Sequence, residues 1–391
     1  MSSEKWNTLL NNTNRLTTPA MQKEILSAEE CELFLDLIAK STQQFAKEKK
    51  PYNGLKVFTK GVQDVSQNEP FIENPPQDNE SLKEWSTRSF KGEPFGFIMN
   101  FLENYNNTIV EEMAKKVAPL IAELGYPFAG LSMLYFMGDY GYTPFGVHRG
   151  SAGEDGVLFH LGPATKTFYI WETDEYNRLT NHATSYKNVE EILHAATAYI
   201  LEPGDAISFP DDMYHVANTE EFSVSLVLDY RRASQGKVKE LIINELLQVN
   251  PDNDTLLNHI PPSELLQTLN FQNESEQAVK RLMSRLKSNG GFMKPSILSY
   301  SNLDLQGTYQ LKKPFSLELL PLKKQQSTVF ARGHEIIIEN NKELLDFINL
   351  INTGAPINLA TLNIGLQPET LGFDLFQFLM KVDETEILRK L

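Results

Sequence analysis

The sequence is poorest in cysteine. Cys31 is the single cysteine among 391 residues, so no disulfide can form within the chain and a zinc site built from several thiolates is excluded. A chain without disulfides fits a reducing compartment. Its first residues also lack a basic segment followed by an apolar one, so we expect a cytoplasmic protein.

Long apolar runs and positive charge are also scarce. No stretch of about 18 apolar residues occurs, so we expect no membrane-spanning helix. Lys and Arg number 36 against 51 Asp and Glu, and the net charge of −15 argues against nucleic acid or an anionic membrane as a partner. The 41% hydrophobic content is that of an ordinary globular protein, and the length suggests two or three domains.

The N-terminal third carries helical patterns. Ser27 to Glu30 form a capping-box pattern, and the apolar residues that follow share one helix face. We interpret residues 1–125 as a helical region packed on the next domain. Within it, residues 50–95 are expected to be a long ordered loop and residues 97–124 to be helical.

Residues 126–233 change to short β runs separated by Gly and Pro, a pattern typical of a sandwich or barrel. The expected strands lie at 131–137, 157–161, 167–171, 198–201, 206–209 and 222–230. Residues 172–197 interrupt the pattern with a short expected helix at 189–196. Such an insertion at a barrel mouth either covers the substrate or is a surface loop.

The C-terminal part divides in two. Residues 234–300 hold two amphipathic helical segments, 237–249 and 274–286, and form a candidate homodimerisation region. Residues 301–391 mix expected strands at 309–312, 328–331 and 335–339 with expected helices at 342–353 and 375–382, as in a small α/β domain.

Two of the seven histidines stand in strongly patterned segments. His148 follows a turn rich in glycine that begins at Gly141. His215 follows a Pro-Gly-Asp turn ending at Asp205, a short apolar strand and Pro210, so it is expected just past a strand end. Two histidines from different strands of one barrel can converge on a metal ion, and imidazole suits iron, zinc, copper and nickel alike.

These motifs resemble the cupin-like JmjC branch of the Fe(II)/2-oxoglutarate oxygenases. That branch has a histidine near a strand end, a lysine on the next strand, a Glu-Pro-Gly-Asp turn, a proline and a distal histidine. Here those features are His148, Lys166, residues 202–205, Pro210 and His215. The resemblance implies a mainly β double-stranded β-helix (cupin or jelly-roll) core with flanking helices. It also implies Fe(II), 2-oxoglutarate and O2 as cofactors, with the two histidines as metal ligands.

The C-terminal arrangement is similar to the ribosomal-oxygenase subgroup of that family. This subgroup appends a dimerisation region and a winged-helix-like domain. The resemblance therefore implies dimerisation through residues 234–300 and a winged-helix-like domain at residues 301–391.

The sequence departs from the family at the third metal ligand. The family has a carboxylate two residues after the first histidine, whereas this chain reads His148-Arg149-Gly150. In the radical halogenases of the superfamily, Gly or Ala at this place lets a halide bind the iron, so the resemblance favours chloride as a further ligand. The alternatives are a carboxylate delivered by Glu154 or Asp155, which would restore hydroxylation, and a degenerate site. Arg149 is expected either to help hold the halide or a substrate carboxylate, or to be a plain rim residue.

The co-substrate requires a cation for its distal carboxylate, and the family pattern assigns Lys166. Arg231 and Arg232 compete, but they follow the whole apolar strand 222–230 and so stand far along it. Three hydroxyl side chains are candidates for hydrogen bonds to the oxoacid: Tyr135, Thr143 and Thr167.

Other polar residues have plainer interpretations. His160 lies among apolar residues and is expected to be a satisfied core histidine. The Asp211-Asp212 pair is expected either to attract a cationic group or to be two solvated residues of a turn.

Three functions remain open at this point. The first is an Fe(II)/2-oxoglutarate-dependent halogenase acting on an unactivated C–H bond of an amino acid, a peptide or another small substrate. The second is a JmjC-type hydroxylase of a peptide or protein side chain. The third is a non-catalytic cupin that binds a ligand or a partner.

Overall fold

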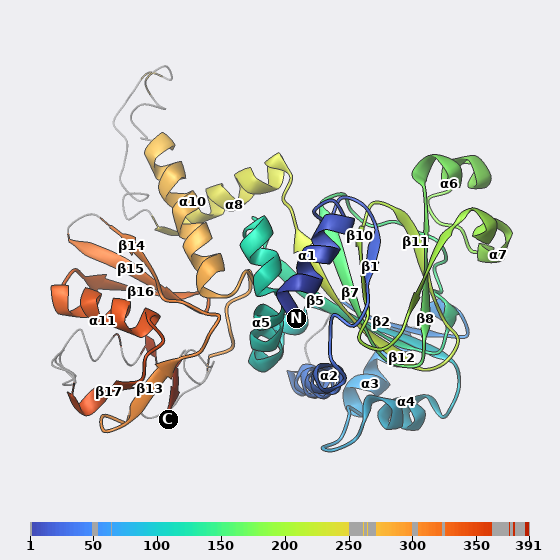
Figure 1. Ribbon diagram of the computed structural model, residues 1–391, viewed down its shortest axis with the longest axis horizontal. Coiled ribbons are helices and arrows are strands. Elements are labelled where there is room, and N and C mark those ends of the chain that lie inside the picture. Colours follow the sequence, from blue (N-terminus) through green and yellow to red (C-terminus); the bar gives the residue numbers. More distant parts are fainter. Residues whose placement is uncertain are drawn as a thin grey trace. The chain divides into compact units, whose positions relative to one another are not determined.

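The computed structural model describes residues 2–48, 54–63, 65–249, 261, 264, 271–298, 304–322, 325–361, 375, 378–379 and 388–390. The chain divides into two compact units (Figure 1). The first unit is Met1–Gly125 with Leu131–Arg232, and the second is Tyr126–Gly130 with Ala233–Leu391.

The first unit contains a large antiparallel sheet. Among the described residues it has eight strands, in the order β1 (Ala20–Gln22), β10 (Ala206–Pro210), β7 (Glu154–Pro163), β12 (Ser223–Arg231), β5 (Leu131–Gly138), β4 (Phe95–Asn100), β2 (Leu55–Thr59) and β3 (Val62–Gln63). Each neighbouring pair is antiparallel. The sheet thus joins strands from the N-terminal third with strands from the predicted barrel.

A smaller antiparallel sheet faces the large one. Its described strands run in the order β6 (Gly141–Tyr142), β11 (Tyr214–Thr219), β8 (Lys166–Trp171) and β9 (Thr197–Leu201). Phe168 and Ile170 of β8 pack with Leu158 and Phe209 of the large sheet, so the inner faces of the two sheets share one core. All six predicted strands of this region are confirmed, whereas β11 was missed because His215 was expected after a strand rather than within one.

Three helices of the first unit are α1 (Ser2–Asn12), α2 (Ala28–Glu48) and α5 (Asn107–Leu124). They cover the outer face of the large sheet. On α1, the Trp6 ring meets Phe159 of β7 edge-on at 6.2 Å, and its Nε1 donates to the Lys116 carbonyl of α5 at 2.8 Å. On α2, the Thr42 hydroxyl lies 2.9 Å from the Tyr135 hydroxyl of β5. These contacts place β5 and β7 with one face against helices and the other toward the small sheet.

The predicted capping box at the start of α2 is confirmed. The Ser27 backbone N–H donates to the Glu30 carboxylate at 2.8 Å, and the Glu30 N–H donates to the Ser27 hydroxyl at 3.2 Å.

The expected loop over residues 50–95 and helix over 97–124 are partly wrong. This stretch contains β2, β3 and β4 and two short helices, α3 (Asn68–Glu73) and α4 (Leu82–Phe90). Helix α5 begins at Asn107. Residues 95–99 of β4 are all buried, so both faces of the strand are apolar and its sequence shows no alternation to distinguish it from a helix.

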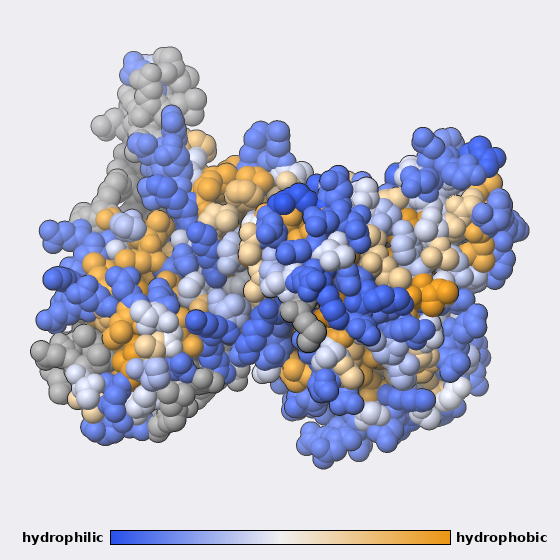
Figure 2. Space-filling model, in the orientation of Figure 1, coloured by the Kyte–Doolittle hydropathy of each residue, from blue (hydrophilic) through white to orange (hydrophobic). Residues whose placement is uncertain are grey.

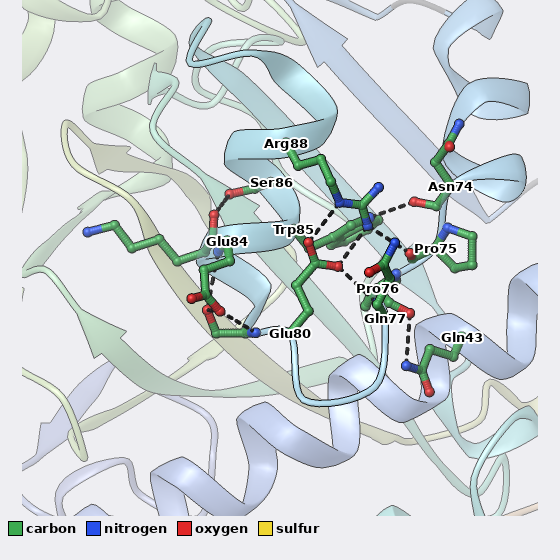
Figure 3. Close-up of polar contacts among 12 residues, drawn as sticks. Gln43, Asn74, Pro75, Pro76, Gln77, Glu80, Glu84, Trp85, Ser86 and Arg88 are labelled. Carbon is green, nitrogen blue, oxygen red and sulfur yellow. Dashed lines mark hydrogen bonds and ion pairs between the residues drawn. The ribbon is translucent and has the colours of Figure 1, made fainter.

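The proline-rich loop before α4 is tied down by polar contacts (Figure 3). Arg88 donates to the Glu80 carboxylate at 2.7 Å and to the Pro75 carbonyl at 3.1 Å. Gln43 of α2 donates to the Pro76 carbonyl at 2.8 Å. The loop is therefore held to two helices.

The insertion at 172–197 covers the outer face of the small sheet with α6 (Thr173–Thr180) and α7 (Val189–Ile192). The Tyr176 ring stacks on Tyr214 at 3.6 Å, and Trp171 Nε1 donates to the Ile192 carbonyl at 2.9 Å. The opposite surface of α6 is hydrophilic (Figure 2) and carries exposed Asp174.

Among the described residues, the second unit holds three helices and two small antiparallel sheets. The helices are α8 (Gln235–Val249), α10 (Phe271–Ser288) and α11 (Lys342–Asn352). One sheet has the strand order β17 (Ile357–Asn358), β13 (Thr308–Leu311) and β18 (Leu388–Lys390). The other has the order β14 (Glu318–Pro321), β15 (Gln326–Ala331) and β16 (His334–Glu339). Arg281 of α10 joins Glu245 of α8 at 3.1 Å and also pairs with Glu335 of β16. The predicted strands and the helices predicted at 237–249, 274–286 and 342–353 are confirmed. The helix predicted at 375–382 lies mostly outside the described residues, and the expected winged-helix character and dimerisation stay predictions. Among the described residues, no helix is both long and apolar enough to cross a membrane.

Candidate metal and co-substrate site

The two predicted metal histidines lie side by side in the first unit. His215 lies on β11, and His148 follows β6. Their backbones pair as an antiparallel bridge, with His148 N–H donating to the His215 carbonyl at 3.1 Å and His215 N–H to the His148 carbonyl at 2.8 Å. The two imidazole ring centroids are 4.5 Å apart. The fold thus brings together two residues that are distant in sequence.

In both imidazoles Nδ1 is hydrogen-bonded to a backbone carbonyl, and Nε2 is the nitrogen left for a metal ion. The Nδ1 atom of His148 lies 3.0 Å from the Gly146 carbonyl, and that of His215 lies 2.8 Å from the Met213 carbonyl. Because a carbonyl oxygen only accepts, Nδ1 carries the proton and Nε2 keeps a free lone pair. Metal-ligating histidines are oriented by hydrogen bonds of this kind. The donor set therefore fits a metal ion that prefers imidazole.

Aromatic side chains surround the imidazoles. Phe168 stacks on His215 with ring centroids 5.5 Å apart, and Phe145 meets His148 edge-on at 4.3 Å. Burial lowers the pKa of His148 to about 4. Burial, and then the nearby His148, lowers the pKa of His215 to about 3. Both side chains are neutral near pH 7, the form in which histidine binds a metal.

The turn before His148 depends on the insertion. Val147 pairs with Tyr186, its N–H donating to the Tyr186 carbonyl at 2.8 Å. Gly146 has φ of +77°, and a Cβ there would lie 2.2 Å from that carbonyl, so only glycine fits. No residue of 172–197 lines the cavity that contains the histidines. The insertion therefore supports the turn that precedes His148 and does not contribute to the lining of this cavity.

An unpredicted carboxylate occupies the place of the missing ligand. A Cβ built on Gly150 would lie 1.5 Å from Asp211 Oδ2 and 2.4 Å from its Cγ. Asp211 Oδ1 lies 3.9 Å from His215 Nε2. Burial, and then the nearby Glu154 carboxylate, raises the pKa of Asp211 to about 6. From the sequence, Asp211 was predicted to attract a cationic group or to be a solvated turn residue, and its place beside the histidines was not predicted.

The three groups do not form a closed cage as they stand. Among the described residues, no three His, Cys, Asp or Glu side chains are arranged closely enough to hold a metal ion. The two imidazoles are in contact, and the Asp211 carboxylate stands 3.9 Å from the His215 Nε2 atom. Coordination by all three would require the carboxylate to approach.

The carboxylates weighed from the sequence lie differently. Asp155 is buried and held by Arg232, whose guanidinium donates to it at 2.6 Å and 2.8 Å, and it does not line the cavity. Glu154 does line the cavity and lies 3.8 Å from Arg231. Asp155 is therefore turned away from the histidines, and Arg232 is already engaged.

Lys166 lines the same cavity from β8. Its side chain is only 1% exposed, and no hydrogen bond or ion pair reaches its ammonium from the described residues. Burial lowers the pKa of Lys166 to about 7. On the same strand, Ile170 pairs with His215. Lys166 lies four residues before Ile170, which is about 13 Å along the strand. A buried charge without a partner is costly, so this position favours an anionic ligand.

The cavity between the sheets has a volume of about 650 Å³. Thr143 lines it, as predicted, and donates to the Ala217 carbonyl at 3.4 Å. Tyr140, which was not predicted, also lines the cavity, and burial raises the pKa of Tyr140 to about 12. The apolar lining of the cavity comes from both sheets and consists of Ile98, Leu134, Phe136, Leu158, Phe168 and Val227.

A second acidic group at the cavity also escaped prediction. Asp229 lies on β12 and lines the cavity. Burial, and then the Glu154 charge, raises the pKa of Asp229 to about 8. A carboxyl group on an otherwise apolar strand could have indicated a lined cavity, because buried acids are rare without a function or a partner.

Three predicted site residues lie outside the cavity. Tyr135 is fully buried on the outer face of β5, where its hydroxyl meets Thr42. Thr167 alternates with Lys166 and Phe168, which line the cavity, and so faces outward. Arg149 is exposed and lies 4.9 Å above the Tyr214 ring, on the side of the insertion. These three do not contact the space beside the histidines.

The remaining histidines behave as structural residues where they are described. His160 is fully buried, with its Nδ1 atom 3.2 Å from the Ser225 hydroxyl and its Nε2 atom 2.6 Å from the Ala164 carbonyl, which confirms the satisfied core histidine. His182 and His194 are exposed. His334 lies in the second unit, and His259 is outside the described residues.

Comparison with known proteins adds the fold to this geometry. No protein-family model matches the chain, and no curated protein matches it. Among solved structures, the ribosomal oxygenase YcfD from Escherichia coli in complex with cobalt and succinic acid matches with a TM-score of 0.53 at 12% identity, over 98% of each chain. The chain has the YcfD fold. YcfD in complex with cobalt and 2-oxoglutarate matches with a TM-score of 0.53 at 13% identity, again over 98% of each chain.

The YcfD likeness spans both units of the chain. It confirms the expected cupin-type core, here as antiparallel sheets combined with helices. The YcfD structures contain a metal and, in one case, 2-oxoglutarate. For the present chain the likeness is one of fold, and its chemistry is argued from its own residues.

Proposed function

We propose that this protein is an Fe(II)/2-oxoglutarate-dependent oxygenase that hydroxylates an unactivated C–H bond. One observation carries the proposal. The Lys166 ammonium, which has no partner among the described residues, lines the same cavity as two neutral histidines whose Nε2 atoms carry no proton. The two histidines suit a metal ion, and the Lys166 ammonium suits a carboxylate. One apolar cavity could therefore bind a metal ion and a dicarboxylate together. The YcfD fold supports the same conclusion.

In this proposal His148 and His215 hold the iron through Nε2, and Lys166 binds the distal carboxylate of 2-oxoglutarate. The iron and 2-oxoglutarate, when bound with O2, supply the oxidising chemistry: one oxygen atom enters the substrate as a hydroxyl and the other enters succinate, with loss of CO2. The chain's residues position these groups. Thr143 and Tyr140 add hydroxyl groups to the cavity wall, and the apolar lining excludes water.

Hydroxylation is placed ahead of halogenation. The sequence favours a halogenase because Gly150 leaves the third ligand position free, but the Asp211 carboxylate occupies the space beside Gly150. A halide would have to enter next to an existing negative charge.

For the substrate we propose a side chain of a peptide or protein, in line with the ribosomal oxygenase whose fold the chain shares. The Glu154 carboxylate on the cavity wall, together with the net charge of −15, suits a basic polypeptide.

The test is anaerobic addition of Fe(II) and then 2-oxoglutarate to the purified chain. We expect a visible absorption band that needs both additions, and slow conversion of 2-oxoglutarate to succinate once O2 is admitted. His215→Ala should lose the band entirely, because it removes a metal ligand. His194→Ala, at an exposed histidine, serves as the matched control and should leave the band unchanged. Absence of the band in the wild-type protein would refute the proposed function and leave the non-catalytic cupin.

A further inference from the structure

We propose that Asp211 is the third protein ligand of the metal and takes over the role that the family gives to the residue at position 150. The inference rests on the proposed function, because it concerns the same metal. It changes the meaning of Gly150. The glycine does not open a coordination position for a halide; it makes room for a carboxylate from the turn between β10 and β11.

The first step concerns the reason for a glycine at 150. Gly150 is not among the glycines with positive φ, so its backbone conformation is open to any residue. Space is what requires glycine there: a Cβ would lie 1.5 Å from Asp211 Oδ2 and 3.0 Å from Oδ1. Even alanine would displace the Asp211 carboxylate.

The second step concerns how Asp211 is held. The Gly150 N–H donates to the Asp211 carbonyl at 2.7 Å, and the Asp211 N–H donates to the Glu154 carbonyl at 3.0 Å. Asp211 is therefore fixed by backbone pairing on both sides. It lies four residues before His215, and the bridge between His215 and His148 continues the same pairing. The backbone thus aligns the Asp211 side chain with the pair of imidazoles.

The third step concerns distance. Nitrogen and oxygen donors lie about 2.1 Å from a first-row metal ion, so two adjacent ligands of an octahedral ion are about 3.0 Å apart. Asp211 Oδ1 is 3.9 Å from His215 Nε2. The two donor atoms are thus about 1 Å farther apart than adjacent ligands of one ion, and the Asp211 carboxylate has to approach His215 Nε2 by that amount for both to bind it.

The fourth step concerns charge. Two neutral imidazoles and one carboxylate supply the same set of ligands as a 2-His-1-carboxylate triad. A chloride in the same place would lie against the Asp211 carboxylate and near Glu154, both of which line the cavity. A cation is favoured there, and an additional anion is not.

The experiment uses the full chain and Co(II) as the probe, with binding measured by calorimetry and by the visible spectrum of the bound ion. Asp211→Asn keeps the shape of the side chain and should weaken Co(II) binding by at least about tenfold, since loss of a supporting group alone costs about that much. Asp212→Asn is the matched control, because Asp212 is the exposed neighbour and should leave the affinity unchanged.

Two further arms separate a ligand from a merely structural residue. Chloride should leave the Co(II) spectrum of the wild-type protein unchanged and should alter that of Asp211→Ala, in which the position is vacated. Gly150→Asp combined with Asp211→Gly returns the carboxylate to the family position. It should restore most of the Co(II) affinity that Asp211→Gly alone loses, which also guards against a variant that simply fails to fold.

The outcomes are distinct. If Asp211→Asn binds Co(II) as tightly as Asp212→Asn, or if chloride changes the wild-type spectrum, Asp211 is not the ligand. The proposed function would still stand, provided that wild-type binding is lost in His215→Ala. If the wild-type protein binds no Co(II), both proposals fall together.

Discussion

Replacing Lys166 by methionine is expected to stabilise the empty protein and to abolish its binding of 2-oxoglutarate. The side chain is 1% exposed and its ammonium has no partner among the described residues, so the folded protein bears the cost of a buried charge. Methionine has a similar length without the charge, and flexible apolar side chains fill such space well. A gain in stability coupled to a loss of binding would mark Lys166 as a group retained for its ligand.

The magnitude follows from the pKa of Lys166. Burial lowers it from 10.5 to about 7, and one unit is worth about 1.4 kcal/mol, so the charged lysine costs about 5 kcal/mol. Between pH 7 and 10.5 the unfolded chain binds a proton that the folded chain lacks, so wild-type stability rises with pH across this window. Lys166→Met should therefore gain about 5 kcal/mol at pH 6 and only about 2 kcal/mol at pH 9.

The assay is urea unfolding followed by tryptophan fluorescence at both pH values. Trp6, Trp85 and Trp171 are the three tryptophans, and all are buried in the first unit, so the signal reports the unit that holds the cavity. Adding 2-oxoglutarate with Mn(II) should raise the transition midpoint of the wild-type protein and leave that of Lys166→Met unchanged.

Lys56→Met supplies the control. Lys56 lines the same cavity but is only partly buried, so its replacement should give no comparable gain at pH 6. The reasoning is refuted if Lys166→Met gains the same amount at pH 6 and pH 9, or if 2-oxoglutarate still shifts its transition. Either result would mean that the ammonium is already solvated or is not the anchor.

Two further changes test the geometry. Tyr135→Phe should cost about 1 kcal/mol through the lost hydrogen bond to Thr42, and calorimetry should show wild-type affinity for 2-oxoglutarate; a weakened affinity would return Tyr135 to the site. Gly146→Ala places a Cβ 2.2 Å from the Tyr186 carbonyl at a positive φ. It should cost at least about 1 kcal/mol and weaken Co(II) binding, since the Gly146 carbonyl orients His148; unchanged binding would show that the turn can relax without moving the imidazole.

The fold was predictable where the alternation of side chains meets clear turn signals. Strands β8 and β10 were placed to within a residue, because Gly and Pro bound them and β-branched or aromatic residues fill them. β4 was mistaken for the start of a helix because both of its faces are covered and its sequence carries no two-residue period. The N-terminal strands were missed for a second reason. They join a sheet that is built mostly from later residues, so the local sequence does not indicate which strand they pair with.

The site was predictable in its family motifs and not beyond them. His148, His215, Thr143 and Lys166 do border one cavity. Tyr135 and Thr167 were placed by residue type, and the parity of each strand turns them outward. A shift of one residue in register turns every side chain of a strand to the opposite face. The inward-facing residues of an apolar run therefore cannot be predicted reliably from the sequence.

Asp211 shows why spacing along the chain misleads in a β structure. Along the chain, the positions that follow His148 and could carry the third ligand are Gly150, Glu154 and Asp155. The volume beside Gly150 is shared with a neighbour across the backbone pairing, since the Gly150 N–H bonds to the Asp211 carbonyl at 2.7 Å. A Cβ at 150 would lie 1.5 Å from Asp211 Oδ2, so a side chain there would have to displace the Asp211 carboxylate. We therefore infer that a glycine at 150 and a carboxylate at 211 belong together. On this argument a glycine in the metal motif indicates an empty coordination position only when the residue paired across from it is too small, or of the wrong charge, to fill the space.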